Sequence, residues 1–85
     1  MRYWKRDFDD RTGVYALYRA PDDTFFPIHQ LGVLGWSRDK YTEDDFIDGW
    51  FVAFDELSEP EARSVVARLR EWRDVVADFD SPVVL

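Results

Sequence analysis

The chain contains no cysteine, one histidine and one methionine. Without cysteine it has neither a disulfide framework nor a thiolate metal site, which suits a reducing compartment. Its apolar runs reach only about five residues, whereas roughly 20 are needed to cross a bilayer. Residues 1–7 also lack the apolar core of a signal peptide. We therefore expect a cytoplasmic location and no membrane contact.

Recognisable catalytic motifs are also missing. The serines lack a G-x-S-x-G context, and the segment 32–35 lacks the lysine and the spacing of a phosphate loop. His29, the single histidine, stands in an apolar context that favours a half-buried structural role. A calcium loop that starts at Asp44 puts Phe46 at a ligand position, where it cannot coordinate. We expect a non-enzymatic protein with no metal and no cofactor.

The composition nevertheless predicts a folded domain. Of the 85 residues, 46% are hydrophobic and 18% are aromatic, too apolar for a disordered chain. We expect one small domain over residues 1–85, with a strand-rich part at 1–54, a helix at 59–79 and a tail at 80–85. The fold class is α+β, with a three- to four-stranded antiparallel sheet and the long C-terminal amphipathic helix packed on one face.

The strand-rich part starts with a predicted hairpin. Residues 3–8 and 14–19 form its strands, because residues 9–13 combine turn-forming Asp with a glycine. Residues 24–28 look extended, but Pro27 favours an edge strand or an irregular loop. Gly32 and Gly35 then interrupt any long element.

A short helical turn is expected at residues 42–49, with Thr42 as its cap and Gly49 at its end. Residues 50–54 should form a further strand. This strand and residues 14–18 are apolar on both faces, so one helix leaves a face uncovered. Either residues 24–36 or a partner must cover it; the partner could be a second copy of the chain.

The C-terminal helix has the strongest local signals. Ser58 and Glu61 form a capping box, with Pro60 in the first turn. The apolar positions that form one face are Ala62, Val65, Val66, Leu69, Trp72, Val75, Val76 and Phe79. Arg73 falls inside that arc and either lays its stem on the core or forms a salt bridge. The tail Pro82-Val83-Val84-Leu85 either frays, covers a core edge or adds a strand to a partner.

The acidity of the chain is local. Its net charge is −7, and residues 42–61 hold eight acidic side chains with no Lys, Arg or His. The remaining residues sum to a charge of +1. Two interpretations remain open. The acids could serve the helix start and solubility, or they could form a surface that meets a basic partner.

Aromatic side chains among the acids favour the docking interpretation. The predicted partner-binding residues are Tyr41, Glu43, Asp44, Asp45, Phe46, Asp48, Trp50, Asp55 and Glu56. The predicted function is a small acidic protein-binding module that inhibits or modulates a basic protein. One alternative is an inhibitor that mimics nucleic acid, and another is a self-assembling homo-oligomer, such as a dimer through an apolar sheet face.

Direct nucleic-acid binding is not expected from the net charge, although Arg2, Lys5, Arg6 and Arg11 make the N-terminal hairpin basic at one end. That end could instead face the acidic window, within the fold or in a neighbouring copy.

Three short segments also resemble a set of short proteins from actinobacteria and their phages. They are Tyr3-Trp4-Lys5-Arg6, Gly35-Trp36 and Leu57-Ser58-Glu59-Pro60-Glu61-Ala62, about a third of the chain. Residues 49–54 depart from that group by being more apolar. The resemblance implies a strand-rich domain closed by a helix, and a phage or mobile-element protein that acts on a host protein. It carries no activity and no site residues.

Overall fold

The computed structural model describes residues 1–7, 13–24, 26–49, 54–72 and 76–84. The protein has an α+β fold, with an antiparallel five-stranded sheet in the order β4-β3-β2-β1-β5. The strands are β1 (Arg2–Asp7), β2 (Val14–Ala20), β3 (His29–Leu31), β4 (Trp36–Arg38) and β5 (Asp55–Leu57). The helices are α1 (Lys40–Ile47) and α2 (Glu59–Trp72). None of the helices in the described ranges is long and apolar enough to cross a membrane.

The hairpin of β1 and β2 forms as predicted, and the α+β class is confirmed. The sheet has five strands instead of three or four, because β3 and β4 were not predicted. Each is three residues long, too short for a clear alternation. The glycines that were expected to interrupt this region connect the two strands, and the Gly32 N–H donates to the Gly35 carbonyl at 2.9 Å. Pro27 lies in the irregular segment before β3.

Of the strand expected at residues 50–54, the structure describes only Phe54, which is not in a strand. Residues 50–53 lie outside the described residues, and Phe54 comes just before β5. The observed edge strand, β5, pairs with β1 through Tyr3 and Leu57. Its sequence, Asp-Glu-Leu, has little strand propensity of its own, so its pairing depends on β1.

Helix α1 is capped one turn earlier than predicted. Asp39, in an extended conformation, accepts a hydrogen bond from the Thr42 N–H at 3.1 Å. The Thr42 hydroxyl donates to the same carboxylate at 2.8 Å, so Thr42 lies inside the helix instead of capping it. The predicted end is confirmed, because Gly49 follows the cap Asp48 with a φ of +87°.

Helix α2 begins as predicted but ends sooner. The Ser58 N–H donates to Glu61 at 3.0 Å and the Glu61 N–H donates to Ser58 Oγ at 3.3 Å, which completes the capping box. The expected end at residue 79 is wrong, because α2 ends at Trp72 and residues 76–79 are not helical. Residues 73–75, which include Arg73, lie outside the described residues. Tertiary bonds hold residues 76–79, since the Ala77 N–H donates to the Gly32 carbonyl and the Trp36 Nε1–H donates to the Phe79 carbonyl.

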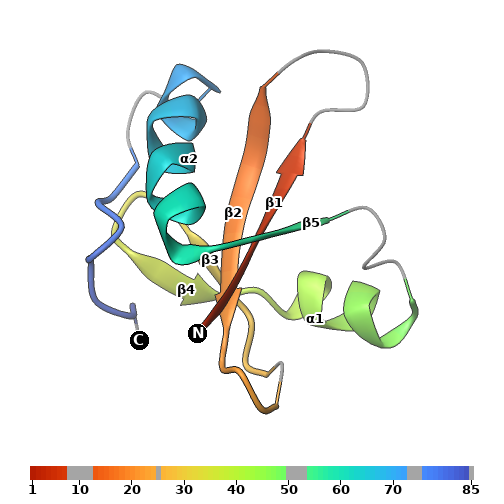
Figure 1. Cartoon of the computed structure of the whole chain (residues 1–85). Helices are drawn as coiled ribbons and strands as arrows, with labels where there is room; N and C mark the ends of the chain where they lie inside the picture. The colour runs from red at the N-terminus through yellow and green to blue at the C-terminus, as the bar shows by residue number, and fades with distance from the viewer. Residues whose placement is uncertain (8–12, 25, 50–53, 73–75, 85) are drawn as a thin grey trace.

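The two helices lie on opposite sides of the sheet (Figure 1). Helix α2 packs on β1 and β2 over a core of Tyr3, Val14, Leu17, Leu31, Trp36, Ala62, Val65, Val66, Leu69, Val76 and Phe79. The other face carries a second core of Trp4, Ala16, Tyr18, Ala20, Ile28 and Phe54, with Phe46 of α1 against it. Among the described residues, the cover expected from residues 24–36 is thus confirmed at Ile28, and Phe46 of α1 and Phe54 also contribute to it.

The C-terminal tail covers the β4 edge of the sheet, one of the roles expected for it. Val83 forms a parallel bridge with Trp36. The Trp36 N–H donates to the Pro82 carbonyl at 3.2 Å, and the Val84 N–H donates to the Trp36 carbonyl at 2.7 Å.

Candidate functional site

The acids of residues 42–61 separate into two groups. Five of them have partners within the fold: Glu43 with Arg38, Asp55 with Lys5, Glu56 with Arg2, Glu59 with Arg63, and Glu61 with the Ser58 N–H. The other three are Asp44, Asp45 and Asp48, all in or directly after α1. None of these three takes part in an ion pair among the described residues. The charge available to a partner is therefore concentrated on one short helix.

Glu43 is a structural residue. It is 7% exposed, and its carboxylate accepts hydrogen bonds from Arg38 Nε and Nη2, both at 2.9 Å. It also accepts from the buried Ile28 N–H at 3.1 Å. The hydrogen bonds from Arg38 lower the pKa of Glu43, against the opposing effect of burial. This predicted partner-binding carboxylate thus ties α1 to β4 and to the start of β3.

Asp55 and Glu56 lie on the edge strand β5 and face the basic N-terminal strand. Lys5 Nζ lies 3.3 Å from Asp55. Arg2 forms a fork on Glu56, with Nε at 3.0 Å and Nη2 at 2.7 Å, and that hydrogen bonding lowers the pKa of Glu56. Arg2 and Lys5 thus face the acidic window within the fold, which is one of the two placements expected for the basic end of the hairpin. Arg11 lies outside the described residues.

Helix α1 presents its remaining charges to solvent. Tyr41, Asp44, Asp45 and Asp48 follow an i, i+3, i+4, i+7 spacing, which places them along one side of the helix. Tyr41 is 87% exposed. Asp44 and Asp48 are exposed and Asp45 is half-buried. Lys40 offsets one of these three charges in number, so the segment keeps two uncompensated negative charges.

Phe46 attaches α1 to the sheet. Its ring lies 5.2 Å from Trp4, edge on, and 5.3 Å from Phe54, stacked. Phe46 is therefore partly a core residue. From the sequence it was predicted only as a partner-binding residue. Trp50, the third aromatic residue of the predicted site, lies outside the described residues.

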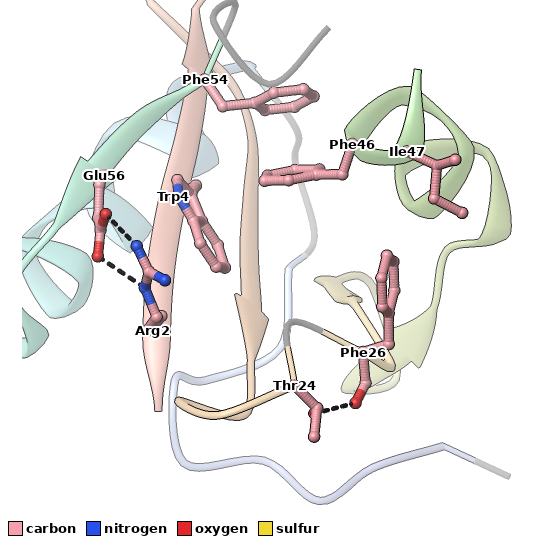
Figure 2. Close-up of a pocket in the computed structure, with 8 residues that line it drawn as sticks. All are labelled: Arg2, Trp4, Thr24, Phe26, Phe46, Ile47, Phe54 and Glu56. Atoms are coloured by element: carbon pink, nitrogen blue, oxygen red, sulfur yellow. Dashed lines mark hydrogen bonds and ion pairs between the residues drawn. The ribbon is translucent and has the colours of Figure 1, made fainter. Parts of the chain in front are cut away.

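A groove of about 470 Å³ opens between β1 and α1. Its lining residues are Arg2, Trp4, Thr24, Phe26, Phe46, Ile47, Phe54 and Glu56. Figure 2 shows Phe46 and Phe54 at one end, Trp4 along one side, and Ile47 and Phe26 opposite it. The walls are mostly apolar, and the two charged lining residues, Arg2 and Glu56, neutralise each other.

The groove continues into a second, more polar pocket of about 390 Å³. The two pockets share Phe26 and Ile47, and the second adds Arg38, Lys40, Glu43 and Asp44. An apolar trough therefore leads directly to the charged side chains of α1.

Only part of this site was predicted from the sequence. Phe46 and Glu56 were predicted, but Trp4, Phe26, Ile47 and Phe54 were not. Ile47 offered one signal, because it is an apolar side chain in an acidic helix and it is 69% exposed. The others come from β1 and from the chain segments before β3 and β5, and no local pattern links them.

The described residues that line the two pockets include no His, Ser or Tyr, the side chains that most often serve as a nucleophile or its base. Lys40 lines the second pocket together with Glu43 and Asp44. The Thr24 hydroxyl donates to the Phe26 carbonyl at 2.7 Å. The described residues contain no group of three or more His, Asp or Glu positioned to hold a metal ion.

His29 is a half-buried residue of β3, paired in register with Arg19 and Arg38. Burial lowers its pKa, and it lines neither pocket. This is the structural role expected for it.

Comparison with protein-family models, curated proteins and solved structures gives no match to this chain. The function of the site is therefore inferred from its own residues.

Proposed function

We propose that this chain is a small acidic protein-binding module, without catalytic activity, that docks a basic protein through α1. The observation that carries the proposal is the selective pairing of the acids. Within residues 42–61, all acidic side chains except Asp44, Asp45 and Asp48 have partners inside the fold. Unpaired charges of one sign on a small surface steer an oppositely charged partner and raise its association rate.

The resemblance to phage and mobile-element proteins favours a host protein in the cytoplasm as the partner, with inhibition or modulation as the outcome. Mimicry of nucleic acid is less favoured than docking on an ordinary basic surface. Double-stranded DNA carries about one negative charge per 1.7 Å of axis, and three carboxylates on α1 are a short array beside that.

The self-assembly alternative was motivated by a sheet face without cover. Both faces of β1 and β2 carry buried side chains. Among the described residues, these two strands therefore have no uncovered face that favours self-assembly. Sedimentation at several concentrations tests it directly, and a monomer at the highest concentration is expected.

Charge reversal tests the proposal. The variant Asp44→Lys/Asp45→Lys/Asp48→Lys removes the charges of α1, and Asp22→Lys/Glu71→Lys/Asp78→Lys is the matched control. Each variant replaces three acids by three lysines, so both change the net charge by the same amount. The control acids are exposed, and the ion pairs that Asp22 and Asp78 make with the N-terminus and Arg70 are surface pairs of little weight. Each protein is immobilised and exposed to a lysate of the native host at low and at high salt.

At low salt, we expect the wild type and the control to retain a basic protein that the α1 variant does not retain. High salt should release this protein, because salt screens exposed charges beyond about 8 Å at physiological ionic strength. With that protein purified, association with the α1 variant should be at least about tenfold slower. Equal retention by the two triple variants would contradict the proposal.

A further inference from the structure

The groove between β1 and α1 has a form that the fold alone does not require. Trp4, Phe46 and Phe54 form its inner wall and are buried or half-buried, as core residues are. Phe26 and Ile47 are on the outer wall and exposed, Ile47 by 69%. An exposed apolar wall that faces a buried aromatic wall leaves a slot with apolar surface on both sides (Figure 2).

The slot is held open by contacts that do not depend on a ligand. Phe46 is fixed by its rings' contacts with Trp4 and Phe54. The Arg2 guanidinium lies 5.4 Å from the centre of the Trp4 ring and is oriented by its fork on Glu56. A preformed site binds more tightly, because less side-chain ordering is lost on binding.

Size and charge define the occupant. A volume of about 470 Å³ lies in the usual range of ligand pockets, roughly 300–1,000 Å³. The slot opens beside Asp44, and Asp45 and Asp48 belong to the same helical segment. A second copy of the chain carries a charge of −7 and would be repelled, whereas a basic segment is attracted.

We propose that the groove receives one large apolar side chain of the basic partner, Trp, Phe or Leu, while Lys or Arg residues on either side of it reach the acids of α1. This rests on the proposed function and adds the recognition element to it. Interfaces commonly concentrate their binding energy in one buried aromatic or aliphatic residue surrounded by weaker polar contacts. Here the acids would speed the encounter, and the groove would decide which basic segment stays bound.

Synthetic peptides test this without a known partner. The first probe is a blocked heptapeptide with Trp at its centre, flanked by Gly and then by Lys on both sides. The second has Ala in place of Trp, and the third probe is N-acetyltryptophanamide, which has no charge. Binding to the intact chain is followed by NMR titration, with the indole N–H of Trp4 and the amide of Ile47 as reporters in the groove.

Two variants separate the groove from the charges. Ile47→Ser removes apolar surface from the outer wall without a change in charge. Leu34→Ser is its control, because Leu34 is 75% exposed and lines neither pocket. The Asp44→Lys/Asp45→Lys/Asp48→Lys variant removes the acids and leaves the groove walls in place.

We expect the Trp peptide to bind at least about tenfold more tightly than the Ala peptide, since burial of a large apolar side chain is worth a factor of this size. Its binding should shift the Trp4 and Ile47 signals. Ile47→Ser should reduce the ratio of the Trp-peptide affinity to the Ala-peptide affinity severalfold, and Leu34→Ser should leave this ratio unchanged. The triple variant should weaken the binding of both peptides by a similar factor.

Three results would count against the inference. Equal affinities of the Trp and Ala peptides, both dependent on the α1 acids, would refute the groove as an anchor site and leave the proposed function standing. Equal affinities of N-acetyltryptophanamide and the Trp peptide would mean a site for neutral molecules. Failure of both peptides to bind would refute the proposed function as well.

Discussion

Replacement of Glu43 by alanine is expected to destabilise the fold by about 2–3 kcal/mol, because the buried Ile28 N–H would lose its hydrogen-bond acceptor. Ile28 is fully buried, and its N–H donates to Glu43 at 3.1 Å. The lost ion pair adds little, since the Arg38 side chain is 55% exposed and exposed pairs are weak.

That loss is large for a chain of this size. A domain of 85 residues has a free energy of unfolding of about 4–13 kcal/mol. Each kcal/mol shifts the Tm of such a domain by roughly 4–8 °C, so Glu43→Ala should lower it by roughly 10–20 °C. Thermal unfolding followed by circular dichroism measures this directly.

Two further variants identify the cause. Arg38→Ala removes the ion pair but leaves the Ile28 N–H bonded to Glu43, so its loss should be clearly smaller. Glu43→Gln retains an oxygen that can accept from Ile28 and should fall between wild type and alanine. The reasoning would be refuted if Arg38→Ala cost as much as Glu43→Ala, or if Glu43→Ala left the Tm unchanged.

The effect should also depend on pH. The Arg38 hydrogen bonds hold the pKa of Glu43 below its ordinary value in the folded protein. A lowered folded-state pKa means that the contribution is complete above the unfolded-state pKa, from about pH 5 upwards, and is lost as the pH falls through the folded-state pKa. The difference in Tm between wild type and Glu43→Ala should therefore narrow in acid.

Two other substitutions test the fold and the surface. Gly35→Ala should destabilise by about 1–3 kcal/mol, because Gly35 has a φ of +140° and a Cβ there would collide with the Pro82 carbonyl oxygen; Gly32→Ala, with ordinary contact distances, should change stability by less than about 0.5 kcal/mol. Denaturant unfolding compares the two, and equal losses would contradict the role of the tail contact. Lys40→Glu should speed association with the basic Trp peptide about two- to fivefold at low salt, measured by stopped-flow fluorescence, and an unchanged rate would argue against α1 as the docking surface.

Local hydrogen bonding explains the parts of the fold that were predicted correctly. The capping box of α2 spans four residues, and the sequence between the two strands of the hairpin contains turn-forming residues. Such features depend on neighbours in the chain and little else. The start of α2 and the first hairpin were therefore predicted to within about one residue.

Tertiary contacts explain the parts that were not. The apolar period of α2 continues to Phe79 in the sequence, yet the chain leaves the helix, because Ala77 pairs with Gly32 and the Trp36 indole binds the Phe79 carbonyl. Val76 and Phe79 are buried in the same core as α2 all the same. Burial was predicted correctly there, and the backbone conformation was not.

The sequence alone determined the quantity and the location of the acidic charge, the α+β class and the strand at residues 14–18 that is apolar on both faces. Which acids remain available was decided by the tertiary structure, through partners as distant in sequence as Arg2 and Glu56. The groove was decided in the same way, because its walls come from β1, α1 and the segments before β3 and β5. The charge of a side chain follows from its residue type. Whether that charge is neutralised, and what shape the surface takes, depends on which distant segments the fold brings into contact.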